Sequence, residues 1–250
     1  MTPIWVFPAY PLLLSAPFGS NLIAAAAKSK QLGSLNAVAV ALASVTAQGT
    51  GFLISFMVCA AFLYRLMTQK LPRDAQRPGV FISIGPSGFT AAGMVQLGNL
   101  TADIFPRDFM GTEQAVYILK LVSYMTGLWL WGLSIWFFLV SVGSLWKYFR
   151  PDHKGKLPFQ MTWFSFVFPN TALVRPSFPC VNHANAVYSP SRRSADVGRF
   201  LPQVTATEAL GMAIDSAGLQ ILGCILAGCI IFVWIFVFSS MVRCLWRREL

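Results

Sequence analysis

Residues 76–98 read Gln-Arg-Pro-Gly-Val-Phe-Ile-Ser-Ile-Gly-Pro-Ser-Gly-Phe-Thr-Ala-Ala-Gly-Met-Val-Gln-Leu-Gly. After Arg77 the stretch carries no charge, and it is long enough to cross a hydrocarbon core as a helix, which takes about 20 residues. Pro86 lies near its centre, and a proline inside a helix removes one backbone hydrogen bond. In lipid this break is tolerated only where protein or a watery cavity satisfies the freed carbonyl. The stretch therefore predicts a membrane helix that does not face lipid.

The composition of the whole chain supports a membrane protein. Of its 250 residues, 56% are hydrophobic and 11% are charged, whereas about 25% are charged in a typical soluble domain. The apolar runs are long and continuous, which favours helices over the short alternating strands of a barrel. We predict an all-α membrane protein with about six transmembrane helices. The expected segments are residues 4–27, 36–63, 80–100, 117–146, 159–173 continued after 204, and 217–242.

Prolines occur inside the first, third and fifth segments and are absent from the second, fourth and sixth. We therefore predict that the proline-bearing segments form an inner, pore-lining layer and that the others face lipid. A packed bundle with ordinary proline kinks is the alternative. The hydroxyl groups of the third segment could solvate an anion weakly enough to release it, or its small residues could serve only packing. The candidate pore-lining or kink residues are Pro8, Pro11, Pro86, Ser87, Gly88, Thr90, Pro169 and Asn170.

Lysine and arginine are distributed unevenly between the two ends of these segments. The richer side carries Arg65, Lys70, Arg73, Arg77, Lys147, Arg150, Lys154, Lys156, Arg243, Arg247 and Arg248. The other side carries Lys28, Lys30, Arg107 and Lys120. Cytoplasmic loops of membrane proteins are enriched in these residues. We therefore expect a multi-pass protein with its C-terminus in the cytoplasm.

A polar stretch at residues 174–203 interrupts the fifth segment before it has spanned the membrane. It contains four arginines on the outer side, against the charge bias. Removing these thirty residues joins Leu173 to Val204 and restores a continuous apolar helix. We hypothesise that the stretch is a translated, retained intron. A genuine extracellular loop is the alternative.

Four motifs in the first, third and fifth segments indicate a relationship. Ile-Gly-Pro-Ser-Gly-Phe-Thr-Ala-Ala begins at Ile84, and Trp-Phe-x-x-x-Phe-Pro-Asn-Thr-Ala-Leu ends at Leu173. Trp-Val-Phe-Pro-Ala-Tyr-Pro occupies residues 5–11, and Thr-Ala-Thr-Glu-Ala-Leu-Gly occupies residues 205–211. Together they resemble the tellurite-resistance and dicarboxylate transporter family, which includes slow anion channels, malate transporters and fungal sulfite efflux pumps. The motifs are most similar to those of the sulfite pumps.

The resemblance implies a ten-helix fold of five hairpins, in which the odd helices line a pore in each subunit of a homotrimer. Residues 1–250 would form a single partial transporter domain that matches helices five to ten. A phenylalanine in the ninth helix occludes the pore in the family, and Phe168 holds the matching position, with core packing as the alternative. Glu208 lies near the outer end of the rejoined fifth helix. It is a candidate for proton coupling or an interfacial carboxylate.

The function implied by the resemblance is transport of small anions, most similar to sulfite efflux across the plasma membrane. Malate or C4-dicarboxylate transport, an anion channel, and an inactive truncated membrane protein are the alternatives. An enzyme is disfavoured because the two histidines, His153 and His183, lie in a loop and in the polar stretch. The cysteines lack metal-ligand spacing, and the basic residues form clusters between apolar spans. We expect no metal, cofactor or nucleic acid, and an anion and the lipid bilayer as partners.

Overall fold

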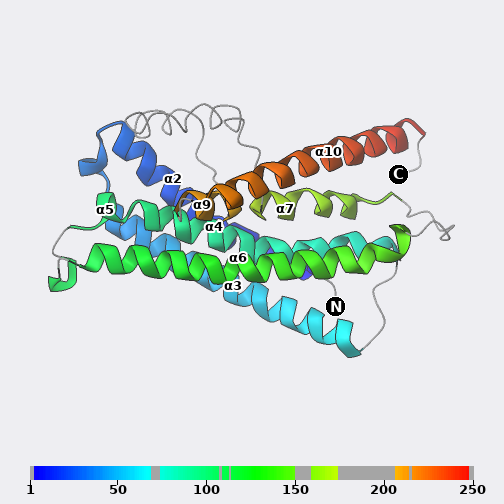
Figure 1. Ribbon diagram of the computed structural model, residues 1–250, viewed down its shortest axis with the longest axis horizontal. Coiled ribbons are helices and arrows are strands. Elements are labelled where there is room, and N and C mark those ends of the chain that lie inside the picture. Colours follow the sequence, from blue (N-terminus) through cyan, green and yellow to red (C-terminus); the bar gives the residue numbers. More distant parts are fainter. Residues whose placement is uncertain are drawn as a thin grey trace.

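The computed structural model describes residues 3–68, 74–106, 109–112, 114–149, 159–173, 206–213 and 216–247, and within them all regular structure is helical (Figure 1). The all-α class predicted from the sequence is confirmed for this part of the chain. Four described helices are long and apolar enough to cross a membrane, compared with the six segments predicted. These four spans are Ala37–Thr68, Gln76–Asn99, Ala115–Leu145 and Ile221–Trp246.

Three of the six segments form long continuous helices. They are α3 (Ala37–Thr68), α6 (Ala115–Leu145) and α10 (Ala217–Arg247). None contains a proline, so the hydrogen-bond ladder of each is uninterrupted. All three finish toward the same end of the molecule, at the right of Figure 1.

The other three segments, here called the interrupted segments, are each divided into shorter helices. The first comprises η1 (Pro3–Ala9), α1 (Tyr10–Leu13) and α2 (Ser15–Lys28). The second comprises η3 (Asp74–Ser83), α4 (Ile84–Asn99) and α5 (Thr101–Ile104). The third comprises η6 (Met161–Phe166), α7 (Phe168–Leu173) and α9 (Ala206–Ala213). The polar stretch predicted at residues 174–203 lies outside the described residues. Short 3-10 turns, η2 (Leu32–Ser34), η4 (Phe109–Gly111) and η5 (Trp146–Phe149), complete the described elements.

Helix α4 is the centre of the fold. It packs against α2, α3, α6, α7 and α9 (Figure 1). In the most apolar part of the span Gln76–Asn99, which contains α4, 83% of the residues are buried, compared with 22% in α3 and 28% in α6. The proline-bearing third segment is therefore the inner one, and the continuous helices expose large apolar side chains to the surroundings.

Small residues allow the neighbours of α4 to approach closely. A Cβ atom at Gly93 would lie 2.7 Å from the Cβ atom of Ala16 on α2. A Cβ atom at Gly98 would lie 2.6 Å from the Cβ atom of Ser123 on α6. Both distances are shorter than real carbon contacts, so these crossings require glycine. Packing by small residues is thus present in the third segment, as expected for membrane helices.

A buried amide connects two interrupted segments to α3. Gln48 is fully buried, and its Oε1 atom accepts the backbone N–H of Ala16 at 3.1 Å. Its Nε2 atom donates to the hydroxyl oxygen of Thr90 at 2.9 Å, and that hydroxyl donates to the carbonyl of Pro86 at 2.7 Å. Ala16 lies just after the break between α1 and α2, where the helical ladder is incomplete. Gln48 therefore supplies a partner that the broken backbone lacks.

Replacement of this amide tests its contribution. We expect Gln48→Leu to lower the free energy of unfolding by about 1–3 kcal/mol, because a buried N–H group loses its acceptor. The midpoint of thermal unfolding in detergent measures the change. Thr50→Val is the matched control, since Thr50 is exposed and its hydroxyl bonds only to its own helix. Equal midpoints for the two variants would show that the amide contributes little.

Candidate functional site

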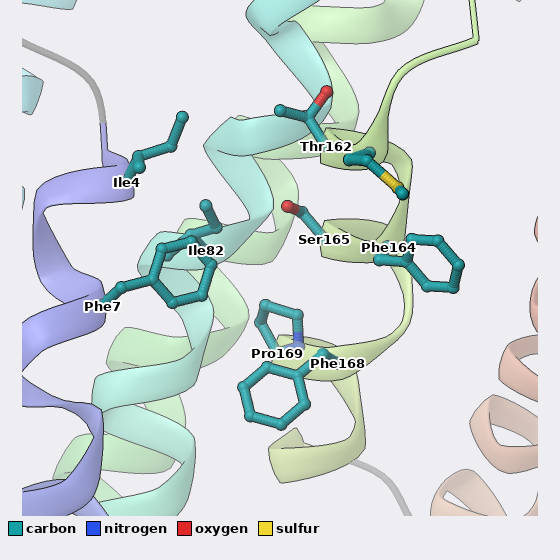
Figure 2. Close-up of a pocket in the computed structure, with 9 residues that line it drawn as sticks. Ile4, Phe7, Ile82, Thr162, Phe164, Ser165, Phe168 and Pro169 are labelled. Atoms are coloured by element: carbon teal, nitrogen blue, oxygen red, sulfur yellow. The ribbon is translucent and has the colours of Figure 1, made fainter. Parts of the chain in front are cut away.

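A cavity of about 560 Å³ lies among the interrupted segments (Figure 2). Its described lining residues come from η1, η3, η6 and α7, which means from all three interrupted segments and from none of the continuous helices. They are Ile4, Phe7, Ile82, Met161, Thr162, Phe164, Ser165, Phe168 and Pro169.

The wall of the cavity is apolar except for two hydroxyl groups. Thr162 and Ser165 provide them, and the Ser165 hydroxyl points toward the space between η6 and Ile82 in Figure 2. No charged side chain occurs among the lining residues. Such a wall can donate hydrogen bonds to an anion but does not hold it by a fixed positive charge, which favours release.

Phe168, which lines the cavity, contacts one aromatic ring from each of the other two interrupted segments. The ring centroid of Phe168 lies 5.4 Å from that of Tyr10 and 5.9 Å from that of Phe89. Tyr10 and Phe89 are 6.0 Å apart and nearly perpendicular. These are favourable separations for aromatic pairs. We call Tyr10, Phe89 and Phe168 the aromatic cluster.

Phe168 lies at a bend in the chain. The 3-10 helix η6 ends at Phe166, α7 begins at Phe168, and Pro169 has no N–H to continue the ladder. The Asn170 side chain donates through Nδ2 to the Phe166 carbonyl at 2.8 Å. Asn170 is 4% exposed, and its Oδ1 atom has no hydrogen-bond partner among the described residues. Phe168 remains 45% exposed because it borders the cavity.

The sequence-predicted residues of the third segment lie away from the cavity. Pro86 and Ser87 line a separate small space with side chains of α3 and α6. The Ser87 hydroxyl donates to the Ile84 carbonyl at 3.2 Å, and Thr90 bonds to Pro86 and Gln48. Gly88 is buried. The predicted hydroxyl groups therefore satisfy backbone and side chains within the bundle.

Of the remaining predicted residues, some line the cavity and others do not. Pro169 lines the cavity beside Phe168, whereas Pro8 and Pro11 are exposed. Glu208 lies in α9, which packs against α4 and α10, and its side chain is outside the described part of the structure. No group of three His, Cys, Asp or Glu side chains that could hold a metal occurs in the described ranges.

Sequence reasoning did not identify Tyr10, Phe89 or Gln48. Gln48 had a detectable signal, since it is a lone amide in an otherwise apolar span. Tyr10 lies between two prolines, but its contact with Phe168 joins residues far apart in the chain. Such a contact depends on how the segments pack.

Comparison with known proteins places this arrangement in a family. The family model described as voltage-dependent anion channel, SLAC1, matches residues 1–185. The chain belongs to the SLAC1 anion channel family. The family resemblance inferred from the motifs is thereby confirmed. The names of the SLAC1 family and of the relatives below refer to channels and transporters rather than to enzymes.

Several curated relatives of this SLAC1 chain are transport proteins. The malic acid transport protein of Schizosaccharomyces pombe is 25% identical over 242 residues, which cover 97% of this chain and 46% of the relative. The sulfite efflux pump SSU1 of Arthroderma otae is 24% identical over 254 residues, which cover 100% of this chain and 56% of the pump. The chain thus spans about half the length of these relatives. No solved structure matches it.

Water access to the cavity can be measured with cysteine labelling. In a chain whose native cysteines are replaced by alanine, we expect Ile4→Cys in the cavity to react with a charged, membrane-impermeant thiol reagent. Leu139→Cys is the control, because Leu139 is 61% exposed on the continuous helix α6 and is expected to face lipid. A thiol in lipid stays protonated and meets no charged reagent. Equal labelling rates would contradict an aqueous cavity.

Proposed function

We propose that the protein transports small anions across a membrane through a passage lined by the interrupted segments and gated by Phe168. One observation carries the proposal: the described residues that line the cavity come from the three interrupted segments alone, and one of them, Phe168, belongs to the aromatic cluster. Non-helical backbone in a membrane belongs where it borders protein or water. The membership in an anion channel family gives the charge of the substrate.

Sulfite efflux is the proposed activity, and transport of malate or another C4-dicarboxylate is the alternative. Relatives named for each substrate match at nearly the same identity, 24% and 25%. The motif Phe-Pro-Asn-Thr-Ala-Leu around Phe168 supports the sulfite pumps. Both substrates suit a wall with two hydroxyl groups and no fixed charge.

We place these segments in the second part of a ten-helix pore fold that assembles as a homotrimer in the plasma membrane. The ten-helix proposal is supported by the alternating interrupted and continuous segments and by the half-length match to the relatives. The trimer and the plasma membrane rest on the family resemblance. A cytoplasmic C-terminus is supported by the uneven distribution of lysine and arginine in the sequence and by the common end toward which α3, α6 and α10 finish (Figure 1).

Glu208 remains our candidate for proton coupling. Its helix α9 packs against α4, the central helix of the bundle, and a carboxylate within a membrane span is a functional candidate by default. The same proposal assigns kink roles to Pro8, Pro11, Pro86 and Pro169, and it assigns to Ser87, Gly88, Thr90 and Asn170 a place along the passage beyond the cavity itself.

Truncation of the gate tests the function. We expect Phe168→Ala to raise passive sulfite flux through proteoliposomes about tenfold, because removing a barrier of about 1.4 kcal/mol raises a rate by this factor. Two ring contacts worth about 0.5–1.5 kcal/mol each provide a barrier of this size. Malate flux is measured in parallel to separate the two substrates. Phe232→Ala is the control, since Phe232 is 74% exposed on α10. Absence of sulfite and malate flux in every variant would contradict the proposal.

We also propose that residues 174–203 are a translated, retained intron. The proposal is supported by the contact between α7 and α9, which both pack against α4 as parts of one segment. Sequencing of mature transcripts across Leu173 and Val204 tests it. We expect most messages to lack these thirty codons. An abundant mature message that retains them would show a genuine loop.

A further inference from the structure

Tyr10 contributes the most buried ring of the aromatic cluster. It is 6% exposed, whereas Phe168 is 45% exposed. Tyr10 opens α1, directly after the 3-10 turn η1, and its ring contacts both Phe168 and Phe89. Phe168 therefore rests on a surface that is itself fixed inside the bundle.

The hydroxyl group of Tyr10 repairs the backbone break made by Pro86. Proline has no N–H, so the carbonyl of Ile82, four residues earlier, loses its helical partner. Tyr10 Oη donates to this carbonyl at 3.3 Å in a buried contact. An unsatisfied carbonyl is costly in a membrane interior, so the bond holds the Tyr10 ring in one orientation.

Gly85, the residue before Pro86, makes room for the Tyr10 hydroxyl. A Cβ atom at Gly85 would overlap Tyr10 Oη and would lie 3.0 Å from Tyr10 Cζ. No side chain larger than hydrogen fits there without moving the ring. The adjacent Gly85 and Pro86 thus supply the space and the carbonyl acceptor for one tyrosine.

We propose that Tyr10 is a positioning residue for the gate: anchored to the Ile82 carbonyl, its ring is the seat against which Phe168 closes. The inference rests on the gating role proposed for Phe168. Tyr10 would link the first and second interrupted segments to the gate on the third, because Gly85 and Pro86 of the second segment determine where the Tyr10 ring lies. Phe89, one turn after Gly85 on α4, forms the other side of the seat.

Passive sulfite flux in two backgrounds tests the seat. Tyr10→Phe keeps the ring and removes only the hydrogen bond. Losing one such bond shifts an equilibrium by about fivefold, so we expect about fivefold more flux than in the unmodified chain. In the Phe168→Ala background the same substitution should change nothing, because no gate remains to be positioned. A similar rise in both backgrounds would overturn the proposal.

A second pair of variants uses the steric contact. Gly85→Ala should also raise the flux by displacing the ring. When Gly85→Ala is combined with Tyr10→Phe, the flux should rise by less than the product of the two single increases. The new methyl group clashes with Tyr10 Oη, and Tyr10→Phe removes this atom. Gly132→Ala is the control, because a Cβ atom at Gly132 on α6 meets nothing within 4 Å. Full independence of the two substitutions, or an equal rise with Gly132→Ala, would contradict the seat.

A spectroscopic measurement separates this inference from the proposed function. With 4-fluorophenylalanine at position 168 of the full chain, the ¹⁹F resonance reports the ring environment without any transport. We expect Tyr10→Phe to shift or split this resonance and Gly132→Ala to leave it unchanged. If Tyr10→Phe shifts the resonance but Phe168→Ala does not raise the flux, the gate is refuted and the seat is retained. An unchanged resonance would refute the seat, whatever the flux.

Discussion

The fold depends on one constraint: a backbone carbonyl or N–H inside a membrane needs a hydrogen-bond partner even where the helical one is missing. The interrupted segments meet this need with side chains from their neighbours. Tyr10 bonds to the Ile82 carbonyl, which Pro86 leaves free, and Asn170 bonds to the Phe166 carbonyl, three residues before Pro169. Gln48 provides the acceptor for Ala16 after the break in the first segment. Because two of these partners belong to other segments, the breaks specify which segments lie together.

The same constraint separates inner from outer elements. A continuous helix satisfies its own backbone and can expose apolar side chains to lipid, as α6 does over most of its length. An interrupted segment cannot do so without neighbours. Helix α4 illustrates this contrast, since its span contains Pro86 and is the most buried of the four. The cavity lies where the broken parts of the three segments meet, at η1, η3 and the junction of η6 with α7.

Proline spacing was enough to predict the inner position of the third segment, because the cost of a broken ladder in lipid is a local property. The direction of side chains was not predictable in this way. For Ser87 and Thr90 the sequence left a choice between donors to an anion and packing; both hydroxyl groups bond within the bundle, and Ser165 borders the cavity. The rotation of α4 about its axis decides this, and its close crossings at Gly93 and Gly98 set that rotation. Phe168 was accessible from the sequence through a motif, whereas Tyr10 required the packed structure.

The placement of positive charge is consistent with a conduit that binds its anion weakly. Arg77 is buried, but its Nη1 atom donates to the Ser144 carbonyl at 3.1 Å and its guanidinium lies 5.8 Å from the Tyr148 ring centroid. It therefore bonds near the end of α6, where a cation complements the helix dipole, and it is not among the residues that line the cavity. An anion in the cavity would feel this charge as part of a field rather than as a direct ion pair. In the proposed transport, release of the anion from the cavity would then depend on two hydroxyl groups and on Phe168 rather than on a fixed charge.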